Sequence, residues 1–136
     1  MDEAELRRRL AAAPVGRLAT VTPEGGPHVV PCCFVLCGET VYSAVDAKPK
    51  TTSRLQRLAN VRANPHAALL VDQYDDDWSQ LWWVRADGTA RVVATGEELD
   101  AAVIALADKY SQYRAQPPAG PALAIDVQRW TGWSFG

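Results

Sequence analysis

The run from His28 to Leu36 combines apolar side chains on both faces of a strand with a proline inside it. In an extended segment alternate side chains share a face, and here one face would carry Val30, Cys32, Phe34 and Leu36. A strand that is apolar on both faces belongs to a barrel wall that another layer covers. Pro31 cannot donate a ladder hydrogen bond, so we expect a bulge, a sheet edge or a ligand in place of a partner strand there.

Short strands and helical stripes alternate along the rest of the chain, separated by turn signals. We expect helices near 2–13, 54–63 and 96–110, and further strands near 16–22, 40–43, 66–74, 81–85, 89–95 and 123–127. Asp87-Gly88 predicts a hairpin between two of these strands, and Thr95 with Glu98 predicts a capping box at the last helix. These elements indicate a mainly β fold with helices.

The length and charge of the chain restrict its partners. At 136 residues it is about one domain long, so we expect residues 1–136 to form a single domain. The formal net charge of −2, with both signs interspersed, provides no basic face for a nucleic acid. No apolar stretch approaches the roughly 18 residues of a membrane span. We therefore expect a cytoplasmic protein with no nucleic-acid or membrane partner.

Side chains that could perform chemistry by themselves are scarce. Cys32, Cys33 and Cys37 are crowded in one apolar run, which suits neither a disulfide framework nor the spacing of a zinc site. We interpret them as reduced and buried, the alternative being a reactive thiol in an exposed, electropositive niche. His28 and His66 stand alone, and no nucleophile motif occurs. We predict no metal site and no catalytic side chain, so a cofactor would carry any reaction.

The segment Lys48-Pro49-Lys50-Thr51-Thr52-Ser53 gathers two ammonium groups and three hydroxyls in front of a helix. Unpaired N–H groups and the positive end of the helix favour an anion there, and the hydroxyls add donors. The segment lacks the glycines of a P-loop or of a dinucleotide fingerprint. It predicts a phosphate-binding junction between strand and helix, with a solvated lysine pair beside an ordinary helix cap as the alternative.

Aromatic residues gather in two places. The first group is Tyr74, Trp78, Trp82 and Trp83, and the second is Trp130, Trp133 and Phe135. Neighbouring residues of a strand point to opposite faces, so one small barrel cannot easily bury both Trp82 and Trp83. Large aromatic patches indicate a surface between molecules or a ring-binding cleft, while one or two of the tryptophans would be ordinary core.

Several short motifs, taken in order, resemble one known family. They are Gly16-Arg17-Leu18-Ala19-Thr20, Pro27-His28-Val29-Val30-Pro31, Asp46-Ala47-Lys48-Pro49-Lys50, Leu58-Ala59-Asn60-Val61-Arg62-Ala63-Asn64-Pro65 and Leu70-Val71-Asp72. Their order and spacing are similar to the pyridoxamine 5′-phosphate oxidase-like split-barrel superfamily, and within it to the actinobacterial deazaflavin-dependent oxidoreductases. The chain lacks the C-terminal arginine and histidine motif of the true pyridoxamine phosphate oxidases.

The resemblance implies a split β-barrel of six to seven antiparallel strands with three to four helices. It also implies a homodimer with a flavin-type cofactor in the groove between its subunits. The residues that it implies in cofactor binding are Pro31, Cys32, Ser43, Lys48, Lys50, Thr51 and Trp78. The lysine segment would hold the cofactor phosphate, and the residues near Pro31 would line the ring. Trp78 would lie near the dimer groove, partly supplied to the other subunit.

We therefore expect an oxidoreductase that transfers a hydride between reduced coenzyme F420, a deazaflavin, and a small unsaturated or quinone-like substrate. Flavin mononucleotide (FMN) in the same groove is the first alternative. Arg54 and Arg57 would favour the deazaflavin by binding its acidic oligoglutamyl tail. A dimeric protein that binds the cofactor without turnover is the second alternative, because no catalytic side chain is compulsory.

Overall fold

The computed structural model describes residues 1–44 and 52–136, with the side chains of the second range described from residue 56 onward. These residues contain seven strands, four helices and one 3₁₀ turn. In chain order they are α1 (Glu3–Ala12), β1 (Gly16–Val21), β2 (Pro27–Cys32), β3 (Val35–Cys37), β4 (Thr40–Ala44), α2 (Thr52–Ala63), β5 (His66–Gln73), η1 (Trp78–Gln80), β6 (Trp82–Val93), α3 (Glu97–Lys109), α4 (Ser111–Ala115) and β7 (Ala122–Ser134).

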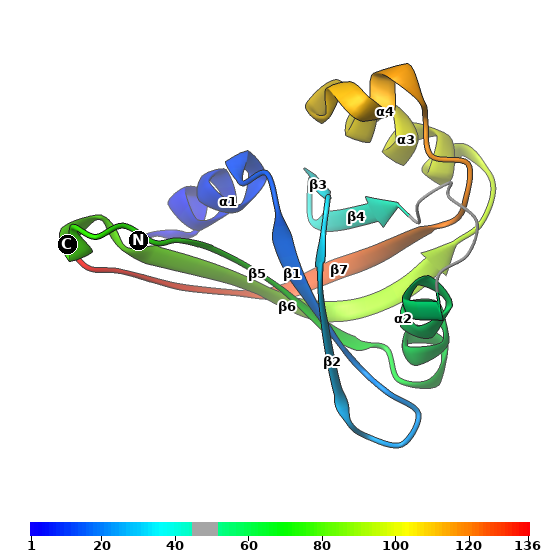
Figure 1. Cartoon of the computed structure of the whole chain (residues 1–136), viewed down its shortest axis with the longest axis horizontal. Coiled ribbons are helices and arrows are strands. Elements are labelled where there is room, and N and C mark those ends of the chain that lie inside the picture. Colours follow the sequence, from blue (N-terminus) through cyan, green and yellow to red (C-terminus); the bar gives the residue numbers. More distant parts are fainter. Residues whose placement is uncertain (45–51) are drawn as a thin grey trace.

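All seven strands form one antiparallel sheet in the order β2-β1-β5-β6-β7-β4-β3. β2 and β3 are its two edges, although only Cys33 and Phe34 separate them along the chain. The sheet must therefore curl round on itself, and it forms a barrel that stays open between β2 and β3 (Figure 1). The predicted fold class, a mainly β split barrel with helices, is confirmed.

The inner face of this curled sheet forms the core. Leu18, Leu69, Val84 and Ile125, from four different strands, are each at most 1% exposed. Such burial of large apolar side chains is the main favourable term in folding. Figure 1 shows α1 at the side of the sheet near both chain termini, and α3 with α4 beside β3 and β4. The helices thus cover the core at separate points around the barrel.

A buried polar contact fixes α2 to the sheet. Asn60 is fully buried, and its side-chain amide donates a hydrogen bond of 3.0 Å to the hydroxyl of Thr20 in β1. The amide oxygen of Asn60 in turn accepts a bond of 2.7 Å from Gln56, one turn earlier in the helix. Because buried polar groups are costly without partners, this chain of bonds defines one position for α2 against β1.

The prediction of one strand from His28 to Leu36 is wrong. The chain forms β2 up to Cys32, leaves the sheet, and begins β3 at Val35. β2 is an edge strand whose outward side chains face solvent, with Val29 at 60% exposure, so the run is not buried on both faces. Pro31 lies on this edge, which is one of the three settings that we expected for it. An edge strand tolerates a proline because no neighbouring strand needs an N–H on its open side.

The hairpin predicted at Asp87-Gly88 is also wrong, since β6 runs without a turn through both residues. A two-residue hairpin of the Asp-Gly type needs positive φ angles, and Gly88 is not among the positive-φ glycines of the described residues. Instead, the register between β6 and β7 shifts at Asp87/Gly88, which marks a β-bulge. A Cβ on Gly88 would collide with the backbone carbonyl of Asp126, so the glycine permits two strands to approach closely.

The capping box predicted at Thr95 and Glu98 is wrong as well. Gly96 is the N-cap of α3, with φ of 98° and no side-chain capping bond. Glu98 instead accepts bonds of 2.7–2.8 Å from Arg91 of β6 and of 2.6 Å from the hydroxyl of Tyr42. These bonds, from Arg91 above all, lower the pKa of the Glu98 carboxyl to about 2. The carboxylate therefore ties the start of α3 to the sheet rather than capping the helix.

Candidate functional site

The junction between the two edge strands is held from outside the sheet. The amide of Phe34 donates to the hydroxyl of Tyr110 at 3.0 Å, and the carbonyl of Phe34 accepts a bond of 2.9 Å from Lys109. The Lys109 ammonium also lies 3.8 Å from the centre of the Phe34 ring. Residues at the end of α3 thus replace the missing strand partner, and they fix the backbone where the barrel is open.

The inner side of the junction brings together Cys32, Ser43 and Arg57. The hydroxyl of Ser43 donates to the carbonyl of Cys33 at 2.9 Å, and it also interacts with the Cys32 thiol. Burial raises the pKa of Cys32, and the positive charge of Arg57 opposes this shift. The Nε atom of Arg57 is buried and has no hydrogen-bond partner among the described residues. Arg57 therefore combines a charge that acts on Cys32 with a buried donor that no described residue satisfies.

The three cysteines differ in exposure, so the prediction that all are buried is wrong. Only Cys32 is buried, whereas Cys37 is half-buried and Cys33 is exposed. The physical reason is that the chain leaves the sheet after Cys32, which turns the next side chain toward solvent. Burial lowers the pKa of the neighbouring Lys109 ammonium to about 8, and the thiols of Cys33 and Cys32 act against this shift.

The structure brings together some of the predicted site residues. Pro31, Cys32 and Ser43 lie at the junction, and their role in lining a ring stays a prediction. Trp78 is 60% exposed on η1, in the β5–β6 connection, which lies beside the two termini and away from β3 and β4 (Figure 1). The predicted phosphate residues Lys48, Lys50 and Thr51 lie outside the described residues.

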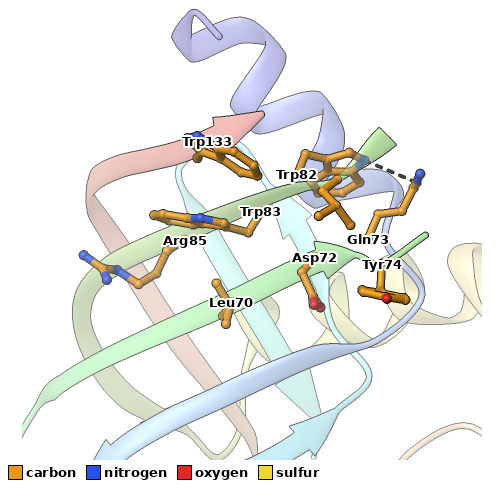
Figure 2. A pocket seen from close by; sticks show the side chains of 9 residues that line it. Leu70, Asp72, Gln73, Tyr74, Trp82, Trp83, Arg85 and Trp133 are labelled. Carbon is orange, nitrogen blue, oxygen red and sulfur yellow. Dashed lines mark hydrogen bonds between the residues drawn. The ribbon is translucent and has the colours of Figure 1, made fainter. Parts of the chain in front are cut away.

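A cavity opens on the outer face of the sheet. Its volume is about 450 Å³, and Trp83 and Arg85 of β6 lie beside Trp133 of β7 and Leu70 of β5 in it (Figure 2). Strand pairing sets Trp83 directly opposite both Asp72 and Trp133. The adjacent Trp82 packs against the core, so the two tryptophans point to opposite faces as predicted. The lining of this cavity is mainly aromatic and aliphatic.

Sequence reasoning missed the contributions of Lys109 and Tyr110. No local pattern marks them, because they reach the junction from the far end of α3. It assigned Arg57 to a cofactor tail, which stays a prediction, and it did not foresee that the charge of Arg57 acts on the Cys32 thiol. In the described part of the chain no group of three or more potential metal ligands occurs. No helix there is both long and apolar enough to cross a membrane.

An antiparallel sheet curled into a barrel that is open between its edge strands, with helices around it, defines a split-barrel protein. A model of the pyridoxamine 5′-phosphate oxidase family matches residues 2–134, and the chain belongs to this family. No curated protein sequence matches the chain.

Solved structures share the fold. A conserved hypothetical protein of Mycobacterium tuberculosis is 22% identical with a TM-score of 0.81, over 99% of this chain and 86% of that one. An FAD-binding protein of Mesorhizobium loti is 20% identical with a TM-score of 0.73, over 97% and 94%. A haem-binding protein of Mycobacterium smegmatis is 22% identical with a TM-score of 0.73, over 96% of this chain and 57% of that one. At such identities the likeness shows the fold alone.

Proposed function

We propose that the chain binds coenzyme F420 in a homodimer and transfers a hydride between the reduced coenzyme and a small unsaturated or quinone-like substrate. The observation that carries this proposal is the open junction between β2 and β3, at whose residue Cys32 the charge of Arg57 acts, while the buried Nε of Arg57 has no partner among the described residues. Membership of the pyridoxamine 5′-phosphate oxidase family and the fold shared with an FAD-binding protein support a flavin-type ring.

The groups at the junction suit such a ring. A buried donor without a partner costs free energy, and a carbonyl or phosphate oxygen would satisfy Arg57 Nε. β2 is an edge strand, so its outward N–H and C=O groups pair with no other strand and are available to a heteroaromatic ring. Pro31 and Cys32 would lie along the ring, with Ser43 close to both.

The remaining roles concern the ends of the cofactor. Lys48, Lys50 and Thr51 would hold its phosphate, and Trp78 would approach the ring from the other subunit of the dimer. When bound, the reduced deazaflavin supplies a hydride from its central ring carbon. The chain itself would hold the phosphate, orient the ring and keep water away from the reacting carbon.

Two alternatives use the same groove. FMN presents a similar ring and phosphate but lacks the acidic tail, so the junction would bind it through the same residues. A binding protein without turnover is the other alternative, and it gains support from neighbours that bind FAD and haem. A single-turnover experiment separates the classes: an enzyme oxidises its bound reduced cofactor faster when a quinone is added, and a binding protein does not.

Titration of the purified protein with oxidised F420, and separately with FMN, tests the proposal through quenching of tryptophan fluorescence. We expect F420 to bind more tightly than FMN, and Lys48→Ala/Lys50→Ala to weaken that binding by more than about tenfold, because two charge-assisted contacts to phosphate are lost. The control is Arg8→Ala/Arg129→Ala, which removes two exposed charges elsewhere and should leave affinity unchanged. Binding of neither compound would remove the oxidoreductase proposal.

The outer face of the sheet is the surface that we propose for the dimer. Trp83, Trp133 and Leu70 form an aromatic and aliphatic centre there. Two ion pairs border it, Arg17 with Asp72 at 3.4 Å and Arg85 with Asp87 at 3.0 Å. A two-fold axis brings the same patch of both subunits together, and a patch with an apolar centre and both charge signs around it can match itself.

Light scattering tests this dimer. The native protein should have about twice the 14.8 kDa mass of the chain, and Trp133→Ala should raise the dimer dissociation constant by more than about tenfold, because buried aromatic anchors dominate such interfaces. Ile104→Ala is the matched control, since Ile104 is a large apolar residue on α3 that is 71% exposed. A native protein that stays monomeric at all concentrations would contradict the proposal.

A further inference from the structure

The outer face of the sheet contains a hollow beside the aromatic residues that we assign to the dimer. Its volume is about 400 Å³, and Ala19 of β1 and Ala68 of β5 are among its lining residues. Their strand neighbours Leu18 and Leu69 are buried in the core, so the two alanines point to the opposite, outer face. An alanine side chain ends one carbon beyond the backbone, and the surface of the sheet is therefore low at this place.

Strand pairing arranges the outward side chains in three parallel rows across the sheet. The first row, at the hollow, consists of Ala19, Ala68 and Asp87. The middle row consists of Arg17, Leu70 and Arg85. The third row consists of Asp72, Trp83 and Trp133. Figure 2 shows the two tryptophans of the third row on the same side of the sheet as Leu70. Four residues along a strand separate the first row from the third, which is roughly 13 Å, and the middle row lies halfway between them.

The order of these rows allows the face to fit a second copy of itself. Two sheets that pack face to face as a symmetric dimer are related by a two-fold axis that lies between them and parallel to them. An axis that runs across the strands over Leu70 exchanges the first row with the third, so it carries Trp83 of one subunit onto the hollow of the other. An axis over the third row would instead set Trp83 and Asp72 against their own copies and leave the hollow empty. Because interfaces pack as densely as protein interiors, the first arrangement suits this face.

The charges of the face are compatible with an axis over the middle row. Arg17 and Arg85 would then meet their own copies. Each guanidinium is already paired with a carboxylate of its own subunit, Arg17 with Asp72 at 3.4 Å and Arg85 with Asp87 at 3.0 Å. The two subunits therefore bring together neutral ion pairs rather than unbalanced positive charges.

We propose that Trp83 of each subunit fills the hollow around Ala68 of the partner subunit, so that the dimer is interlocked at two equivalent points. This inference rests on the proposed dimer and specifies which residues of the two copies meet. Apolar surface continues beyond the hollow, because Val29, which pairs with Ala19, is 60% exposed. A flat apolar indole ring covers such a surface and removes it from water.

Mixing two variants tests the interlock. Ala68→Phe fills the hollow, and Trp83→Ala removes the side chain that would occupy it. Each variant alone should raise the homodimer dissociation constant by at least about tenfold, because its defect is present at both contact points. A heterodimer of the two variants keeps one native contact, and at the other point the new phenylalanine takes the space that the indole leaves. Native mass spectrometry separates the three dimers by mass, and the heterodimer should bind at least about fivefold more tightly than either homodimer.

The heterodimer also separates failure of the interlock from failure of the dimer. If Ala68 and Trp83 do not meet across the interface, their effects are independent, and the heterodimer constant equals the geometric mean of the two homodimer constants apart from a statistical factor. That value, in a native protein that dimerises, would overturn the interlock and leave the dimer standing. A native protein that stays monomeric would contradict the dimer and the interlock together.

Matched variants complete this test. Ala101→Phe makes the same change at an exposed alanine of α3 and should leave the native dissociation constant within about twofold. If circular dichroism shows that Ala68→Phe does not fold, Ala19→Phe fills the same hollow from β1 and takes its place. Trp83→Leu replaces Trp83→Ala on the same ground, and the geometric mean remains the result that would overturn the proposal.

Discussion

Replacing Gly88 with valine should lower the free energy of unfolding by at least about 3 kcal/mol, and the protein is expected to be near the limit of folding. A Cβ at this position would meet the carbonyl oxygen of Asp126 and lie 3.1 Å from the Cα of Val127. These are backbone atoms of the neighbouring strand, so no side-chain rotation relieves the collision. β6 and β7 would have to separate where they make the most extensive pairing of the sheet.

Urea unfolding followed by tryptophan fluorescence measures this loss, at one fixed protein concentration because the proposed dimer couples stability to concentration. Gly26→Ala is the control, since its new Cβ would approach only the Thr22 hydroxyl, at 3.3 Å, and should change stability by less than about 1 kcal/mol. If Gly88→Val were as stable as the native protein, the close approach of β6 and β7 at this position would be disproved.

Replacing Asn60 with leucine should cost about 2–3 kcal/mol, because the change removes the partner of a buried hydroxyl and disturbs the packing around it. Asn60 is fully buried, and Thr20 is only 3% exposed, so water cannot replace the lost bond without opening the α2–β1 contact. Thr20→Val should also destabilise the protein, since it leaves the Asn60 amide without an acceptor.

The double variant Thr20→Val/Asn60→Leu completes a thermodynamic cycle. With both polar groups removed, the total loss should fall short of the sum of the single losses by more than about 1 kcal/mol. Asn64→Ala is the control for removing an asparagine hydrogen bond at an exposed place, where Asn64 accepts a bond of 3.0 Å from the amide of His66. Additive losses in the cycle would mean that the two side chains do not depend on each other.

Local sequence signals predicted most elements of this fold but not their connections. α1 begins directly after its N-cap Asp2, because a capping aspartate acts within one turn, and such signals are visible in the sequence. Asp87-Gly88 looks like a turn for the same local reason, but pairing with β7, about 40 residues later, determines the outcome there. Long-range pairing of this kind leaves no mark in a short window of sequence.

The candidate site was likewise predictable only where local signals or the family resemblance marked its residues. Pro31 indicated a bulge, an edge or a ligand, and the structure shows the edge; the family resemblance added Cys32 and Ser43, which lie beside it. Tyr110 reaches Phe34 across 76 residues of sequence, and nothing in the local pattern of α3 distinguishes it. The exposure of Cys33 was missed because the run to Leu36 looks like one continuous strand, and only the closure of the barrel explains why it is interrupted.

The attachment of Phe34 to the end of α3 affects how this region exchanges amide hydrogens with water. In a closed barrel the amide of such a residue would be protected by the next strand, and its exchange would require the sheet to open. Here the Tyr110 hydroxyl is its acceptor, so exchange at Phe34 requires only that α3 move away. The junction between β2 and β3 is therefore held by α3. A local movement of α3 would release this junction while the hydrogen bonds between the strands stay intact.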